Sequence, residues 1–150
     1  MKPNLKPYQR KNQRPNYFQQ NIQKFGENFL GQKNSNDMQL DAIRVFRDIA
    51  RGNIDVEEEG KYFLHPQFLE SCIVAAFSKL SLHSINFNGV NLLVSQGAND
   101  ETTMSILEYD RRCAEAYTII YNQLNNIRNT GDVNYLTVMV NNLKNYRNNI

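Results

Sequence analysis

Two histidines and two cysteines are the side chains of this sequence best suited to chemistry at neutral pH. His65 and His83 can exchange a proton in that range, and Cys72 and Cys113 can supply a thiolate or ligate a metal. Zinc sites usually begin with a C-x-x-C or H-x₃-H pair, and neither spacing occurs here. Both cysteines also fall within apolar helical patterns, where burial disfavours the thiolate. We therefore expect no metal, no disulfide and no cofactor.

The positions of the two histidines favour structural roles. His65 directly precedes Pro66 and can cap the helix that this proline opens. His83 follows the predicted end of the same helix, where a cation interacts favourably with the helix dipole. The sequence also contains no nucleophile elbow, no glycine-rich phosphate loop and no H-E-x-x-H motif. No set of residues is predicted to be catalytic.

One dense charged cluster lies in the middle of a predicted C-terminal helix. It consists of Glu108, Asp110, Arg111, Arg112 and Glu115. Glu108 lies three and four residues from the two arginines, and Glu115 lies four residues after Arg111, so most of these charges can pair on one helix surface. Asp110 and Arg111 interrupt an apolar stripe, which indicates a polar contact with another helix or subunit. A paired carboxylate site of the kind that acid–base catalysis requires is not evident, and we expect that the protein is not an enzyme.

The charge of the chain is divided unevenly between an N-terminal segment and the remainder. Residues 1–36 contain seven basic residues and one acidic residue, for a net charge of +6. Residues 37–150 contain 10 basic and 14 acidic residues, for a net charge of −4. Three prolines in the first fifteen residues favour an extended backbone, so we predict a basic arm from Met1 to Pro15. Its positive charges are Lys2, Lys6, Arg10, Lys11 and Arg14.

The partner of this arm is left open by the sequence. Tyr8, Tyr17 and Phe18 lie among the basic residues, and such aromatics suit either a groove on a protein subunit or base stacking on single-stranded nucleic acid. The acidic run Glu57, Glu58 and Glu59 is the first candidate for a protein counter-surface. Against nucleic acid, the remainder of the chain offers no net positive charge to support the arm.

An accessory amphipathic helix is predicted between Asn16 and Gly31. Its apolar side chains Phe18, Ile22, Phe25 and Phe29 recur every three or four residues, and the opposite face is polar. We expect this helix to dock on a partner. The predicted partner-binding residues are therefore Tyr8, Tyr17, Phe18, Ile22, Phe25 and Phe29.

The rest of the sequence predicts an all-α fold. Helices are expected over 37–51, 66–80, 99–129 and 132–150, and the last two should form a long antiparallel hairpin. The segment 85–94 is ambiguous, because apolar residues alternate around Asn88-Gly89 as in a short β-hairpin, whereas a broken helical connection fits as well. We thus expect a small helical bundle as one domain over 37–150, preceded by the arm and accessory helix over 1–36.

These features favour a function in binding. We expect a non-enzymatic structural subunit of a multi-subunit complex, such as a virus particle, that contacts neighbouring subunits through its N-terminal arm. The alternative is a nucleic-acid-binding module that uses the same arm. With no signal-peptide core and no run of about 20 apolar residues, we expect a cytoplasmic location, no membrane contact and no small-molecule substrate.

Overall fold

The structure is a computed structural model that describes residues 35–150, with side chains described from residue 39 onward. Within this range the chain forms only helices, so the predicted all-α fold class is confirmed. The predicted arm and accessory helix lie outside the described residues. The elements are α3 (Ser35–Ala50), α4 (Val56–Glu59), the 3-10 helix η1 (Gly60–Leu64), α5 (Pro66–Ser95), α6 (Glu101–Thr130), α7 (Tyr135–Asn142) and the 3-10 helix η2 (Lys144–Asn149).

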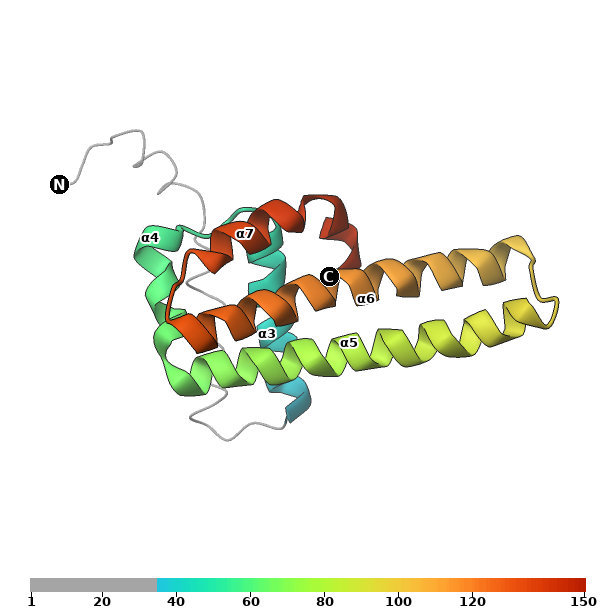
Figure 1. The fold of residues 1–150 in the computed structure, drawn as a ribbon, viewed down its shortest axis with the longest axis horizontal. Helices are drawn as coiled ribbons and strands as arrows, with labels where there is room; N and C mark the ends of the chain where they lie inside the picture. The colour runs from blue at the N-terminus through green and yellow to red at the C-terminus, as the bar shows by residue number, and fades with distance from the viewer. Residues whose placement is uncertain (1–34) are drawn as a thin grey trace.

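The helices α5 and α6 form a long antiparallel pair that sets the shape of the molecule (Figure 1). The other elements gather around one end of this pair, where α5 begins and α6 ends. The other end projects away from them, with its two helices joined by a short connection at the tip. We call the projecting part, residues 82–110, the distal hairpin, and the remaining elements the body.

The hydrophobic core lies in the body. α3 packs against α5, α7 and η2, while α7 and η2 also pack against α6. Phe46 of α3 meets Tyr117 of α6 edge to face, with ring centroids 6.4 Å apart. The largest fully buried side chains come from α3, η1, α6, α7 and the residue between α7 and η2, and they are Tyr117, Phe46, Phe63, Ile49, Ile120, Leu124, Ile127, Leu136, Met139 and Leu143.

Helix ends follow the capping residues of the sequence. α3 ends at Ala50 and is followed by Gly52, whose φ of +73° suits a residue without a side chain, and the Asn53 amide donates to the Asp48 carbonyl at 2.8 Å. The Asp100 carboxylate accepts a hydrogen bond from the Thr103 amide at 3.0 Å and caps α6. The helices predicted over 37–51 and 99–129 therefore end and begin within two residues of the observed bounds.

The segment 85–94 is helical throughout. It belongs to α5, which runs unbroken from Pro66 to Ser95, so both the short β-hairpin and the broken helical connection are wrong. The inner side chains of this segment face a second long helix, and packing against α6 outweighs the cost of about 1 kcal/mol that Gly89 adds to a helix interior.

The long partner of α6 also differs from the prediction. We expected the segment 132–150 to form it, but α7 spans only Tyr135–Asn142 and continues as the six-residue η2. α5 makes a far more extensive contact with α6 than α7 does. The reason is length, because α5 and α6 each contain 30 residues and can pair along most of them.

Candidate functional site

A buried contact between His83 and Asp110 joins the two helices where the distal hairpin leaves the body. The Nδ1 atom of His83 lies 3.0 Å from Oδ1 of Asp110, and the two side chains are only 9% and 8% exposed. The imidazole stacks on the ring of Tyr117 at 6.0 Å and meets the ring of Tyr109 edge to face at 6.1 Å. This contact confirms that Asp110 makes a polar contact with another helix.

The position of His83 corrects its predicted role at a helix end. The helix continues for another twelve residues to Ser95, so His83 lies in its interior and cannot serve as a C-terminal cation. A histidine held by a carboxylate is a frequent part of catalytic sites. Here both side chains are closed off from solvent, and the geometry is that of a polar fastening between two helices.

Burial keeps the neighbouring ionisable groups in their neutral forms. It raises the pKa of the Cys72 thiol and of the Tyr117 hydroxyl well above their usual ranges. A hydrogen bond to Cys113 raises the pKa of Tyr109. Both cysteines are buried free thiols, as the sequence predicts. Cys72 and Tyr117 therefore behave as core side chains at neutral pH.

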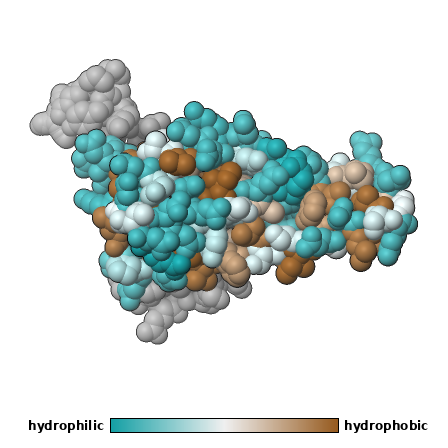
Figure 2. All heavy atoms as spheres, in the orientation of Figure 1, coloured by the Kyte–Doolittle hydropathy of each residue, from teal (hydrophilic) through white to brown (hydrophobic). Residues whose placement is uncertain are grey.

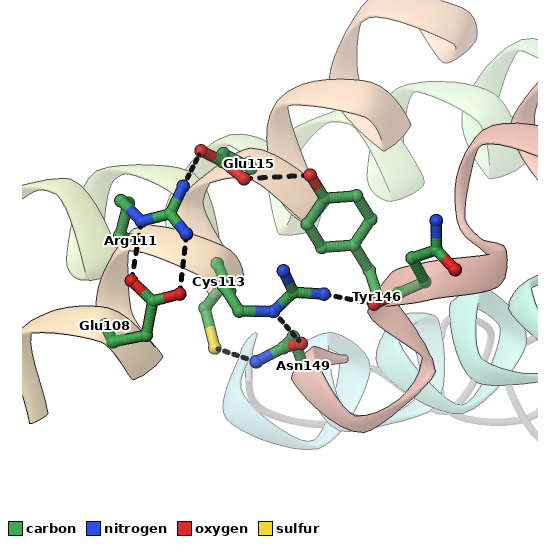
Figure 3. A network of polar contacts seen from close by, with 8 residues as sticks. Glu108, Arg111, Cys113, Glu115, Tyr146 and Asn149 are labelled. Atoms are coloured by element: carbon green, nitrogen blue, oxygen red, sulfur yellow. Dashed lines mark hydrogen bonds and ion pairs between the residues drawn. The ribbon is translucent and has the colours of Figure 1, made fainter. Parts of the chain in front are cut away.

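The charged cluster of α6 forms a network that reaches the C-terminal residues (Figure 3). Arg111 donates to both oxygens of Glu108, at 2.8 and 2.6 Å, and also to Glu115. These bonds lower the pKa of Glu108. The other oxygen of Glu115 accepts a hydrogen bond from the Tyr146 hydroxyl at 2.8 Å, which raises the pKa of that tyrosine. The predicted self-neutralisation of this cluster is confirmed.

Arg112 completes the attachment of η2 to α6. Its guanidinium lies 4.6 Å from the centroid of the Tyr146 ring and donates to the Asn145 carbonyl and to the Asn149 side chain. Asn149 in turn donates to the sulfur of Cys113 at 3.8 Å. Figure 3 shows these side chains directed toward one another from the two elements. The network fastens the C-terminal residues to α6, and its carboxylates are occupied by this task.

The predicted acidic counter-surface is only partly a surface. Glu57 and Glu58 are exposed, but Glu59 is buried and its Oε1 accepts a hydrogen bond from the Asp55 amide at 2.7 Å. The Asp55 carboxylate in turn accepts a hydrogen bond from the Glu58 amide at 3.3 Å. Asp55 and Glu59 therefore both cap the beginning of α4. Glu59 therefore caps a helix with its carboxylate, and the role of this run as a counter-surface for the arm stays a prediction that rests on Glu57 and Glu58.

The distal hairpin exposes a row of large apolar side chains. On α5 they recur at the spacing of one helix face, and on α6 they lie four and seven residues before the buried Cys113. Each of them is exposed between 47% and 69%. We call this set the distal apolar patch. It consists of Leu82, Ile85, Leu92, Leu93, Ile106 and Tyr109.

The two helices contribute to one face of the hairpin. His83 and Asp110 mark the seam between α5 and α6. Because the helices run antiparallel, the residues that precede these two, Leu82 and Tyr109, turn to the same side of the pair. The view in Figure 2 is from one side only, and it also shows hydrophobic side chains gathered over the projecting end.

The distal hairpin also has an uneven charge. Between Leu80 and Asp110 the sequence contains no lysine and no arginine. It does contain exposed carboxylates at the tip, on Asp100 and Glu101, and at Glu108. Between Leu80 and Asp110 the exposed charged residues are thus all acidic, whereas Lys79, Arg111 and Arg112 lie just outside this range.

Most of the predicted binding residues cannot be compared with the structure. The arm charges Lys2, Lys6, Arg10, Lys11 and Arg14 lie outside the described residues, as do the predicted partner-binding residues from Tyr8 to Phe29. The distal apolar patch was missed by sequence reasoning. The sequence signal for the patch is the helical spacing of Leu82, Ile85 and Leu92 across Asn88-Gly89. We did not recognise it because the apolar residues of 85–94 also alternate as in a β-hairpin.

Two further observations concern metals and membranes. Among residues 35–150 no group of three or more His, Cys, Asp or Glu side chains could hold a metal ion. Of the same residues, α5 forms the one helix long and apolar enough to cross a membrane by length and composition. Core helices of water-soluble proteins pass the same test, so the absence of membrane contact stays a prediction.

The His65 position is confirmed only in part. His65 is the N-cap residue of α5 and Pro66 is the first residue of the helix, as the sequence indicates. The imidazole makes no capping hydrogen bond, however, and the side chain is exposed. The cap therefore rests on the extended backbone of this residue and on the fixed φ of the proline.

Comparison with known proteins gives no relative for this arrangement. No protein-family model matches the chain, and neither the curated proteins nor the solved structures that were searched contain a significant match.

Proposed function

We propose that this protein is a non-enzymatic assembly subunit that joins copies of itself through the distal hairpin. The observation that carries the proposal is the distal apolar patch, in which six large apolar side chains on a projecting element are all about half exposed or more. Contiguous apolar surface of this kind commonly marks a protein interaction site. Fully burying one such side chain contributes about 1.5 to 3 kcal/mol.

The location of the patch supports binding as well. The distal hairpin projects from the body, so another chain can reach it from several directions (Figure 1). Among the described residues, His83 and Asp110 are used in the contact between α5 and α6, and Glu115 is used in the network that holds Tyr146. A role in assembly therefore agrees with what the described residues offer.

The test changes one patch residue and measures the assembly state. Leu93→Asp introduces a charge into the patch at a side chain that is 51% exposed, so the fold should persist. Asn91→Asp is the matched control, because Asn91 is exposed on the polar side of the same helix. We expect light scattering to show a smaller assembly for Leu93→Asp and an unchanged one for Asn91→Asp, with equal helical content by circular dichroism.

Two results would contradict the proposal. One is an assembly state for Leu93→Asp equal to that of the wild type. The other is a wild-type protein that stays monomeric and binds single- or double-stranded nucleic acid with an affinity that falls steeply as salt rises, which would favour the alternative function.

A further inference from the structure

The distal apolar patch is exposed in the described residues, and its chemistry restricts what can cover it. We propose that it binds the N-terminal segment 16–31 of a neighbouring copy of this chain. This inference rests on the proposed function, because it assumes that the patch is a contact between chains. It replaces the acidic run at Glu57–Glu59 as the counter-surface for the basic N-terminal region.

Charge favours this occupant over a second distal hairpin. The hairpin has exposed carboxylates and no cation between Leu80 and Asp110, so a second copy of it brings further negative charge to the contact. The segment 16–31 has no net charge, since it contains only Lys24 and Glu27, but the residues 1–15 directly before it carry a net charge of +5. A copy that places segment 16–31 on the patch therefore brings these positive charges toward the acidic hairpin, whereas a second hairpin brings none. Complementary charge guides encounter and sets the register of such a contact.

The apolar residues of the two partners also correspond. The segment 16–31 places Phe18, Ile22, Phe25 and Phe29 at helical spacing, which predicts one apolar face. As a helix it would be about 24 Å long at 1.5 Å per residue, close to the length of about 21 Å that α5 covers from Leu82 to Ser95. One segment can thus cover the patch along its whole length.

The centre of the patch allows a close approach. Gly89 lies between Ile85 and Leu92 on this face, and a Cβ atom added to it would meet nothing within 4 Å. The missing side chain leaves space for a large ring of the partner. Bulky aromatic residues such as Phe25 suit this space, because they supply a large apolar area with few rotatable bonds.

The contact can be tested by cross-linking the full-length protein. Asn21→Cys marks the edge of the predicted apolar face of the segment, and Asn86→Cys marks the edge of the patch beside Leu82 and Leu93. The control replaces Asn86→Cys by Asn91→Cys, an equally exposed asparagine on the polar side of α5. The native cysteines are buried, so a flexible bis-maleimide should react with the introduced thiols.

We expect the Asn21→Cys/Asn86→Cys protein to give dimers and higher multiples at least about tenfold more abundantly than the control with Asn91→Cys. Peptide mapping by mass spectrometry should find cross-links that join residue 21 to residue 86. Mixing isotope-labelled with unlabelled protein before cross-linking would establish that the two residues belong to different chains. Three results would overturn the proposal: no excess over the control, a 21–86 link within one chain, or a dominant 86–86 link, which would make a second hairpin the occupant.

A double-variant cycle separates this inference from the proposed function. If Phe25 and Leu93 meet across the contact, Phe25→Asp and Leu93→Asp should each raise the dissociation constant of assembly by about tenfold or more. The double variant should be little worse than the stronger single variant. If Leu93→Asp weakens assembly and Phe25→Asp does not, the occupant is wrong and the assembly function stands. If Leu93→Asp has no effect, the proposed function fails too.

Discussion

The helices α5 and α6 have two halves that both contain large apolar residues but differ in what surrounds them. In the body, Ile73 and Ile120 are covered by the elements that pack on the helix pair, and they are 5% and 0% exposed. In the distal hairpin, Ile85 and Ile106 have no such cover among the described residues and are 69% and 47% exposed. Two helices alone bury only the seam between them, and a third layer is needed to bury their flanks.

This difference assigns different tasks to the two halves. The body has the packed interior that stabilises the fold, whereas the distal hairpin has apolar area that contributes little to folding and remains available for a contact. Only the seam residues of the distal hairpin, among them His83 and Asp110, belong to the folded interior. Substitutions should therefore separate stability from assembly according to the half in which they lie.

The largest expected effect comes from one substitution made at two isoleucines of α6. Ile120→Ala should lower the free energy of unfolding by about 2 to 5 kcal/mol, because it leaves a cavity in the core. Ile106→Ala is the matched control in the distal hairpin and should change the free energy of unfolding by no more than about 0.5 kcal/mol. Urea denaturation followed by circular dichroism measures the free energy of unfolding of both variants. Equal losses would show that the distal hairpin is as tightly packed as the body.

Thiol reactivity should distinguish the buried face of α5 from its exposed face within the body. Burial raises the pKa of Cys72 and hides its sulfur, so the native thiol should react with a maleimide at least about a hundredfold more slowly than the denatured one. Val74→Cys places a thiol two residues along on the exposed side of the helix and should react at nearly the denatured rate. Rapid native labelling of Cys72 or Cys113 would contradict the packing of the body.

The buried contact at the base of the hairpin should have an intermediate effect. Asp110→Leu removes the partner of the His83 ring and leaves a buried polar group unsatisfied, which should cost about 1 to 3 kcal/mol. Amide hydrogen exchange should accelerate more in the distal hairpin than in α3, since the contact fastens the two helices where they leave the body.

Two variants serve as controls for this prediction. Asp110→Asn keeps an oxygen acceptor and should be less harmful than Asp110→Leu. The double variant His83→Leu/Asp110→Leu removes both polar groups and should recover part of the loss. If Asp110→Leu leaves both stability and hydrogen exchange unchanged, the contact does not hold the hairpin together.

Much of the fold could be predicted because its signals are local. Helix ends depend on a few neighbouring residues, and the predicted ends at 51 and 129 lie one residue from the observed ends at Ala50 and Thr130. The buried faces of α3 and α6 follow from the spacing of apolar residues. The same spacing indicated that Cys72 and Cys113 are buried, and the interruption at Asp110 indicated a polar contact.

The rest depends on contacts between residues far apart in the chain. Asn88-Gly89 favours a turn locally, and only the presence of α6 alongside makes an unbroken helix more stable. The partner of Asp110 is 27 residues away, so no local pattern identified His83. The distal apolar patch was missed for a related reason, because apolar spacing predicts a covered face and cannot show which part of it lacks a cover.

The smallest expected effect comes from a substitution at Gly89, the glycine within the distal apolar patch. Gly89 lies in the interior of α5, has no positive φ and has open space where a side chain would begin. Gly89→Ala should therefore raise the free energy of unfolding by about 0.5 to 1 kcal/mol, because alanine is the better helix former. If the patch binds a partner closely at this point, the same change should weaken assembly while it stabilises the monomer.

The control for this prediction is the same substitution at a glycine that the fold requires. Gly131 ends α6 with a φ of +72°, and its amide donates to the Ile127 carbonyl at 2.7 Å. Alanine is strained in that conformation, so Gly131→Ala should lower the free energy of unfolding by about 1 kcal/mol and leave assembly per folded molecule unchanged. The expected result in urea denaturation is a higher free energy of unfolding for Gly89→Ala and a lower one for Gly131→Ala. If only Gly89→Ala also weakens assembly, Gly89 contributes to a contact between chains. A loss of stability at Gly89→Ala would instead mean that the backbone of the distal hairpin is not helical at this residue.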